Sequence, residues 1–207
     1  MRAVDLTQTI HNGMPVYPGT VPPRLDSASS FERDGYRETA LSLWSHVGTH
    51  MDAPAHLFAD GTTLDRIPVS RFCGRAAMLD CRGVGQGGIT ADMLRTLPLD
   101  TLDFVILRTG WESRFYSPAY YDAFPTMTDT AARLLAASGL SGVGVDAISI
   151  DPVGGPLPNH RIVLGANMVI VENLRGLAEC PDRFIFCAMP LLYENADGAP
   201  VRASAWT

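Results

Sequence analysis

The chain has 207 residues, of which 46% are hydrophobic and 18% are charged, so it is long enough and apolar enough to bury one substantial core. Its 22 acidic residues outnumber the 16 basic ones, and the net charge of −6 argues against a nucleic-acid-binding surface. It has no run of about 18 apolar residues that would span a membrane. Residues 1–19 lack the basic segment and apolar run of a secretory signal. We therefore expect a cytoplasmic protein with a single domain over residues 1–207.

Short apolar or alternating runs, bounded by Gly, Pro or Asp, predict a series of strands. The alternation of Leu41 and Leu43 predicts that residues 39–45 form a half-buried strand. The other expected strands span residues 3–10, 76–81, 104–108, 142–150, 168–171, 184–189 and 201–206.

Helical patterns are fewer than strand patterns. Thr128 can cap a helix in which Leu134 and Leu135 follow at helical spacing, and Gly139 can end it. Shorter helices are expected at residues 90–97 and 118–124. Because the strands do not alternate regularly with helices, we predict a strand-rich α/β domain rather than a doubly wound sheet.

Two other features of the chain carry no predicted chemistry. The glycine-rich segment 83–88 lacks both the dinucleotide-binding spacing and the Lys of a phosphate-binding loop, so it is expected to be a loop. The four cysteines lack C-x-x-C spacing and are expected to be reduced residues of the core.

The chemistry of the chain is concentrated in one short segment, which contains three histidines and one aspartate: His46, His50, Asp52 and His56. His and Asp side chains are ligands that Zn²⁺ and Mn²⁺ accept. A straight strand would place His46 and Asp52 about 20 Å apart, and a straight helix would turn Asp52 away from His46 and His50. We therefore expect a turn, which Gly48 and Pro54 permit.

This segment predicts a metal site with His46, His50 and Asp52 as ligands. Such a site leaves coordination positions open for water, and a metal lowers the pKa of the water that it binds. His56 is not needed as a ligand, and the ordinary pKa of imidazole suits a general acid/base. Asp52 has two carboxylate oxygens and can bridge two ions. Chance clustering is the alternative, and we favour a functional site.

Two residues further along the chain are candidates for a second ion. His160 lies in the proline-rich segment 156–161, and Glu172 closes the apolar run 168–171. A carboxylate at the end of a buried strand is costly unless it is paired or binds a metal. The alternatives are a salt bridge from Glu172 to Arg161 or Arg175, and an ordinary surface-loop position for His160.

The segment 46–56 matches the H-x-G-T-H-x-D-x-P-x-H signature of the metal-dependent cyclase-like hydrolases. That family includes bacterial kynurenine formamidases (arylformamidases) and isatin hydrolases. Other stretches along most of the chain resemble landmarks of the family: residues 4–7, 18–19, 60–61, 108–111, 145–146, 150–151, 172–174 and 200–203. The resemblance implies a swivelling β/β/α fold with a mixed sheet, usually assembled as a dimer or tetramer.

The resemblance also implies a ligand set for two divalent ions, Zn²⁺ or Mn²⁺. Asp52 would be shared between a first set, with His46 and His50, and a second set, with His160 and Glu172.

Further roles follow from the same resemblance. It implies that His56 donates and accepts the proton, and Tyr17 stands where formamidases of the family carry a Trp that contacts substrate. Phe58, which follows the position where the family often has Phe, is a second candidate for substrate binding. Trp111 follows a turn at the end of an apolar run and is a third candidate. Trp44 is expected in the core.

We therefore expect a hydrolase that opens an amide-like C–N bond of a small molecule, such as an aryl formamide or a cyclic amide. Metal-activated hydroxide would be the nucleophile and His56 the general acid/base. A kynurenine formamidase proper and a lactone or imide hydrolase are the alternatives within the family, and Tyr17 and residues 172–174 resemble the wider family more than the kynurenine formamidase branch. The alternatives outside catalysis are a catalytically silent binding protein, against which the intact His56 argues, and a structural zinc domain, which would prefer a closed Cys/His set.

Overall fold

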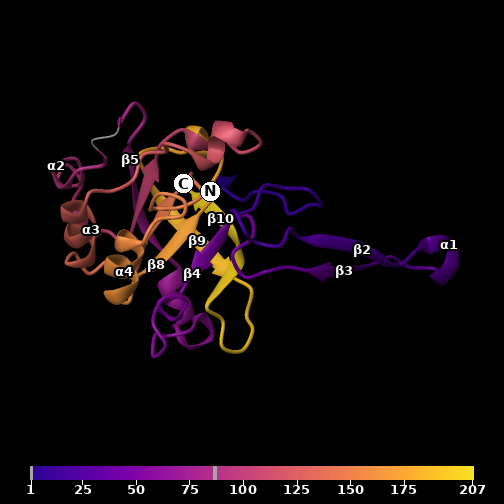
Figure 1. Ribbon diagram of the computed structural model, residues 1–207. Helices are drawn as coiled ribbons and strands as arrows, with labels where there is room; N and C mark the ends of the chain where they lie inside the picture. The colour runs from indigo at the N-terminus through magenta and orange to yellow at the C-terminus, as the bar shows by residue number, and fades with distance from the viewer. Residues whose placement is uncertain (1, 86–87) are drawn as a thin grey trace.

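The computed structural model describes residues 2–85 and 88–207, and its main feature is a sheet that closes on itself (Figure 1). Within these residues, seven strands form a ring in the order β4-β8-β7-β6-β5-β9-β10, in which β10 pairs with both β9 and β4, and β1 adds to β10 outside the ring. The strands are β1 (Ala3–Asp5), β4 (His50–Asp52), β5 (Cys73–Asp80), β6 (Phe104–Arg108), β7 (Gly142–Val145), β8 (Val169–Glu172), β9 (Arg183–Pro190) and β10 (Gly198–Trp206).

The sheet is mixed. Neighbours from β5 to β8 pair in parallel, whereas β4 pairs antiparallel with β8 and with β10, and β9 pairs antiparallel with β5 and with β10. Together with the small number of helices, this confirms the prediction of a strand-rich α/β fold with a mixed sheet.

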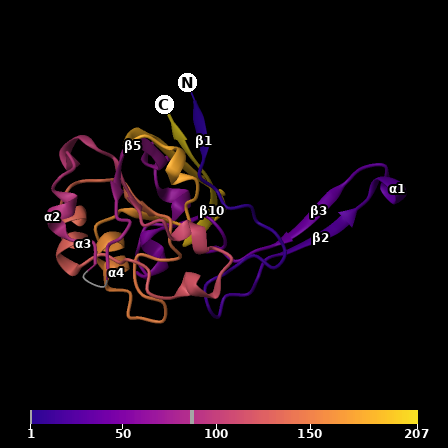
Figure 2. The same ribbon diagram turned by 90° about the horizontal axis from the view of Figure 1, so that it is seen from above.

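Three helices cover one flank of the barrel: α2 (Ala91–Leu94), α3 (Asp129–Ala136) and α4 (Pro158–Gly165). Both views place them side by side, and α3 contacts both α2 and α4 (Figure 2). The predicted caps of α2 and α3 are confirmed, since the side chains of Thr90 and Thr128 accept hydrogen bonds from the first turn of each helix. The predicted helix at 118–124 is a short 3₁₀-helix, Pro118–Tyr121.

The alternation of side chains on β6 shows how two cores share one sheet. Phe104 and Ile106 point into the barrel, while Val105 and Leu107 face the helices, and all four are buried. Because strands β5 to β8 are apolar on both faces, as parallel strands under helices usually are, they lie between the two cores.

A two-stranded arm corrects one prediction. β2 (Arg24–Ser29) and β3 (Glu38–Ser42) form a ribbon that extends away from the body, with helix α1 (Phe31–Asp34) at its tip (Figures 1 and 2). Residues 39–45 were predicted to form a half-buried strand, but every residue of β3 is exposed, and Leu41 is 62% exposed. The prediction was wrong because an alternating pattern of apolar and polar residues indicates a strand with two different faces. It does not show whether another part of the protein packs on the apolar face.

Two cysteines correct another prediction. Cys73 of β5 and Cys187 of β9 are directly opposed in the ladder and form a disulfide, so they are not reduced. Cys81 is free and buried, as expected, and Cys180 is free and half-buried.

Two further points concern the extent of the described chain. Residues 86 and 87 of the predicted glycine-rich loop lie outside the described residues. None of the helices in the described part of the chain has the length and apolar character needed to cross a bilayer.

Candidate metal centre

Strand β4 presents two of the predicted ligands on one face. Side chains alternate along a strand, so His50 and Asp52 point the same way, while Met51 between them packs into the barrel core. β4 pairs antiparallel with β8, and this register sets His50 opposite Glu172. Three candidate ligands are therefore brought together by a single strand pair.

His46 reaches this face through a turn before β4. Gly48 has φ +66°, a conformation that favours glycine, and the chain reverses there. The Nδ1 atom of His46 lies 2.7 Å from Oδ1 of Asp52. The expected turn is therefore present, but it ends at β4, and Pro54 begins the 3₁₀-helix η1 (Pro54–His56) that carries His56.

His160 comes from a helix that the sequence analysis did not predict. It lies in the first turn of α4, where its side chain is only 4% exposed, so the surface-loop alternative was wrong. The backbone N–H groups of Asn159 and His160 both donate to the carboxylate of Asp151, which anchors the start of the helix. α4 packs against β8 and so delivers His160 to Glu172.

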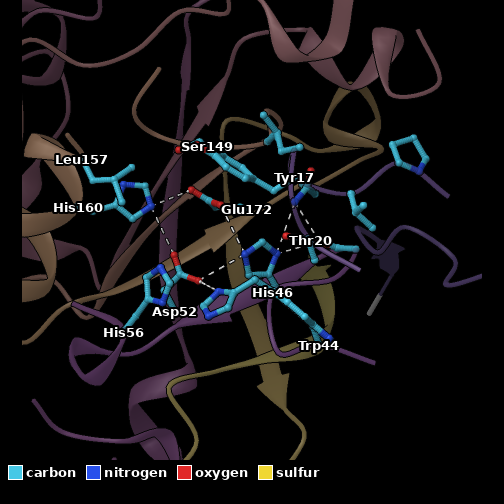
Figure 3. A pocket seen from close by; sticks show the side chains of 16 residues that line it. Tyr17, Thr20, Trp44, His46, Asp52, His56, Ser149, Leu157, His160 and Glu172 are labelled. Atoms are coloured by element: carbon cyan, nitrogen blue, oxygen red, sulfur yellow. Dashed lines mark hydrogen bonds and ion pairs between the residues drawn. The ribbon is translucent and has the colours of Figure 1, made fainter. Parts of the chain in front are cut away.

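The inward-facing atoms of these residues converge at the floor of a cavity (Figure 3). The Nε2 atom of His50 lies 3.4 Å from Oδ1 of Asp52 and 3.5 Å from Oε2 of Glu172. The Nε2 atom of His160 lies 3.3 Å from Oε1 of Glu172 and 3.6 Å from Oδ2 of Asp52. Two groups of donor atoms share Asp52, one with His46 and His50 and the other with His160 and Glu172, and a third group joins His46 to His56 and Asp197.

Two of the histidines are held from behind by partners on their other ring nitrogen. His50 donates its Nδ1–H to the carbonyl oxygen of Gly48 at 2.9 Å, and His160 donates its Nδ1–H to Asp151 at 2.8 Å. Both rings therefore aim Nε2 at the carboxylates. This outer hydrogen bond is the usual support of a metal-binding imidazole.

Asp197, which the sequence analysis did not select, approaches the centre from the opposite side. Its Oδ2 atom lies 2.9 Å from Nε2 of His46 and 3.7 Å from Nδ1 of His56. The rings of His46 and His56 lie close together, with centroids 4.1 Å apart. The only signal in the sequence was an Asp-Gly pair just before the predicted strand 201–206.

The carboxylates of the centre stabilise positively charged groups next to them. Burial disfavours the charged form of His46, but the carboxylates of Asp52 and Asp197 outweigh it and raise its pKa to about 10. Burial likewise opposes protonation of His160, but Asp151 and the two inward carboxylates raise its pKa well above its usual value. In Asp52 burial opposes ionisation, yet the neighbouring imidazoles hold its pKa well below the usual range.

The charge balance and donor atoms of the cavity show whether these residues fit a metal. Among the described residues that line the cavity there is no Arg or Lys to neutralise Asp52 and Glu172, which are 1% and 4% exposed. Buried carboxylates need a counter-charge, and the inward imidazole nitrogens and carboxylate oxygens are donors that divalent ions accept. The donor set therefore fits divalent metal.

The cavity above these residues has a volume of about 340 Å³, and its apolar wall consists of Pro15, Val16, Tyr17, Trp44, Ile148 and Leu157. Tyr17, predicted to bind substrate, lines it, and its hydroxyl accepts a hydrogen bond from the backbone of Gly154. His56 also lines it, and burial lowers the pKa of that imidazole. Trp44 was expected in the core, but it is 53% exposed and forms part of the cavity wall, because it lies where the chain returns from the exposed arm to β4.

The other two predicted substrate-binding residues lie elsewhere among the described residues. Trp111 is not part of the cavity wall; its Nε1–H donates to the backbone of Tyr120, and the guanidinium of Arg114 covers its ring at 4.2 Å. Phe58 lies beside Gly165 at a separate shallow pocket next to α4. The structure thus brings Tyr17 to the cavity but not Phe58 or Trp111.

Comparisons with known proteins agree with this geometry. A kynurenine formamidase of Geobacillus thermodenitrificans (strain NG80-2) is 28% identical over 204 residues, which cover 97% of this chain and 95% of the relative. Isatin hydrolase A from Ralstonia solanacearum superposes with a TM-score of 0.87 at 28% identity, covering 99% of this chain and 91% of that one. A structure described as a potential metal-dependent hydrolase with cyclase activity superposes with a TM-score of 0.83 at 30% identity, covering 99% and 96%.

A family model described as "Putative cyclase" matches residues 4–152, a span that includes the turn before β4, β4 itself and η1. The match extends over well more than half of the chain, and the protein therefore belongs to the cyclase family.

Proposed function

We propose that this protein is a metal-dependent hydrolase that opens an amide-like C–N bond in a small molecule. The observation that carries the proposal is the pair of donor groups sharing Asp52 at the floor of the cavity, with His56 beside them. The similarity to a kynurenine formamidase and to isatin hydrolases supports the same class of reaction.

Two ions, Zn²⁺ or Mn²⁺, are proposed for the centre. His46, His50 and Asp52 would hold the first, and Asp52, His160 and Glu172 the second, which is supported by the convergence of their donor atoms. When bound, such ions polarise a carbonyl group and make water nucleophilic at neutral pH.

The side chains around the centre have separate tasks in this proposal. His56 is the general acid/base, since it borders the cavity and lies outside the two donor groups that share Asp52, and it would pass a proton to the leaving nitrogen. Its lowered pKa leaves the ring neutral and able to accept a proton near pH 7. Tyr17 and Trp44 provide aromatic surface against which a flat substrate can pack.

The proposed substrate is an aryl formamide or a cyclic amide. A cavity of about 340 Å³ whose wall includes Tyr17, Trp44 and Ile148 matches a small aromatic molecule. A kynurenine formamidase proper is the second candidate, favoured by the similarity to the Geobacillus enzyme over nearly the whole chain.

A homo-oligomer, either a dimer or a tetramer, is also proposed. The protruding arm supports this, since Phe31, Tyr36 and Leu41 are 62%, 55% and 62% exposed on a ribbon that has no cover of its own. We propose that the protein acts in the cytoplasm as one functional domain. Light scattering of the purified protein tests the assembly, and a monomeric mass would contradict it.

Elemental analysis followed by an activity panel tests the function. Purified protein should contain a divalent metal, lose activity on chelation and regain it when that metal is restored. The panel should compare an aryl formamide, a cyclic amide, an imide and a lactone under identical conditions. A fully loaded protein that opens none of these would indicate a catalytically silent binding protein.

A further inference from the structure

We propose that Asp197 is a positioning residue that holds His46 with Nδ1 facing the shared carboxylate of Asp52, and that Gly198 provides the space in which this ring lies. The inference rests on the proposed metal-dependent function, because it gives these residues a task towards the metal. Neither residue belongs to the donor sets predicted from the sequence.

The two ring nitrogens of His46 face different carboxylates. Its Nδ1 lies 2.7 Å from Oδ1 of Asp52, and its Nε2 lies 2.9 Å from Oδ2 of Asp197. A neutral imidazole carries one N–H and one lone pair. A histidine that binds a metal is neutral, and when Asp197 accepts its Nε2–H, the lone pair is on Nδ1, the nitrogen that faces the donor group.

The backbone around Asp197 is held by its pairing with β4 and the residue after it. Its carbonyl oxygen accepts a hydrogen bond from the N–H of Ala53 at 2.9 Å. The next residue, Gly198, is the partner of Asp52 in the ladder between β10 and β4. The sheet that places Asp52 therefore also places Asp197, and the two carboxylates hold His46 between them.

Gly198 approaches the imidazole ring of His46 closely. A Cβ atom at position 198 would lie 2.5 Å from Cε1 of His46 and 2.9 Å from its Nε2. Real Cβ atoms do not come so close to another heavy atom, so any side chain at 198 would displace the ring. Gly198 and Asp197 therefore define, from the same side, where His46 can lie.

Asp197 differs from the partners of His50 and His160 in its exposure to solvent. His50 is held by a backbone carbonyl, and His160 is held by a carboxylate that is completely buried. The side chain of Asp197 is 44% exposed, so it can be changed with little disturbance of the core. It also faces Nδ1 of His56 at 3.7 Å, and one carboxylate thus borders both a proposed ligand and the proposed proton carrier.

The experiment measures metal binding in the absence of substrate. Asp197→Ala, Asp197→Asn and Gly198→Ala should be compared with the parent protein by competition for Zn²⁺ against a chromophoric chelator. The absorption spectrum of the Co²⁺-loaded protein provides a second readout that reports ligand geometry. Glu194→Gln is the matched control, because it removes a carboxylate charge from an exposed position in the same loop.

The expected results follow from the hydrogen bond between the Asp197 carboxylate and Nε2 of His46. Asp197→Ala should lower the Zn²⁺ affinity about 10–100-fold, which is the usual effect of losing the outer partner of a metal-binding histidine. Asp197→Asn should lose less, since its amide oxygen can still accept the Nε2–H. Gly198→Ala should alter the Co²⁺ spectrum, and Glu194→Gln should match the parent protein.

Unchanged Zn²⁺ affinity and an unchanged Co²⁺ spectrum in Asp197→Ala would overturn the inference. If that variant does not fold, as judged by circular dichroism, the same comparison is made with Gly198→Ala, and a parental Co²⁺ spectrum there would overturn the inference as well. Because binding is measured without substrate, a parent protein that hydrolyses nothing would contradict the proposed function and leave this test intact. Conversely, if the parent protein is active and the variants bind Zn²⁺ with parental affinity and give the parental Co²⁺ spectrum, only this inference is contradicted.

Discussion

His50 stands directly opposite Glu172 in the antiparallel ladder between β4 and β8, although the two residues are far apart in the sequence. This relationship sets one residue of each proposed donor group side by side before any metal is considered. Asp52, which faces Ile170 in the same ladder, lies on the same face and belongs to both groups. The metal centre is therefore a property of a strand pair, and the next prediction tests the shared member of that pair.

Asp52→Ala is expected to remove metal from the whole centre, because both donor groups lose the residue that they share. Elemental analysis after gel filtration should show less than the parent content for every divalent ion. A chelator should also lower the melting temperature of the parent protein more than that of the variant, since bound metal stabilises only the folded state. A variant that stays fully loaded would contradict the bridging position of Asp52.

His56→Ala is expected to keep its metal and lose catalysis. General acid–base groups contribute about 10²–10⁴-fold to rate, so kcat should fall by a factor in that range. His11→Ala is the control, because His11 lies on the surface beside Tyr116 and outside the cavity wall. Turnover close to that of the parent would exclude His56 as the proton carrier.

Gly61→Ala is expected to reduce activity through the position of His56. A Cβ atom at position 61 would lie 2.5 Å from the carbonyl carbon of Pro54 and 2.6 Å from the backbone nitrogen of Ala55, and backbone atoms cannot yield as a side-chain end can. The 3₁₀-helix that carries His56 must then shift. Misplacing a catalytic group by about 1 Å can cost about 10²-fold in rate.

Gly85→Ala is the matched control for that substitution, since a Cβ atom at position 85 would have no heavy atom of a non-neighbouring described residue within 4 Å. Kinetic constants and metal content should be measured for both variants. If Gly61→Ala retained parental kcat and parental thermal stability, the close packing of Gly61 on η1 would have no functional consequence.

Cys81 is expected to make the fold sensitive to alkaline pH. Burial, followed by the nearby charge of Asp146, raises the pKa of its thiol from 9.0 to about 12. Because the folded pKa lies above the unfolded one, the unfolded chain releases its proton first as the pH rises. The stability that Cys81 contributes is therefore complete below pH 9 and is lost between pH 9 and pH 12.

Urea unfolding at a series of pH values between 8 and 11 tests this prediction on the parent and on Cys81→Ala. At roughly 1.4 kcal/mol per unit, the full effect is at most about 4 kcal/mol. The variant should be less stable at pH 8, where it lacks the packing of the buried sulfur, and should lose less stability as the pH rises. Parallel pH profiles for the two proteins would contradict it.

The local features of this protein could be predicted from residues that are neighbours in the chain. The predicted strands at 104–108 and 168–171 nearly coincide with β6 and β8, because buried strands with parallel neighbours are continuous apolar runs between turn residues. The predicted strand at 184–189 lies within β9, an antiparallel strand that is also rich in apolar residues. The helix capped by Thr128 was also predicted, since a cap and its helix are a local interaction. The grouping of metal-type ligands in residues 46–56 was visible for the same reason, as was the need for a turn at Gly48.

The remaining features depend on contacts between distant segments. The helix that carries His160 begins at Pro158 after Leu157, which has φ +56°, and it is anchored by Asp151. The proline at its first position was the only local signal, because no capping side chain precedes it. Asp197 reaches His46 only because β10 pairs with β4.

The sequence by itself thus determined the chemical character of the centre, because a cluster of histidines and an aspartate around Gly48 constrains the local backbone. Only the tertiary structure decided which side chains surround that cluster. Leu41 and Trp44 look like core residues in the sequence, but the arm leaves the barrel there and exposes both. Burial and long-range pairing are set by the closure of the whole sheet, whereas capping and turn formation are set by adjacent residues.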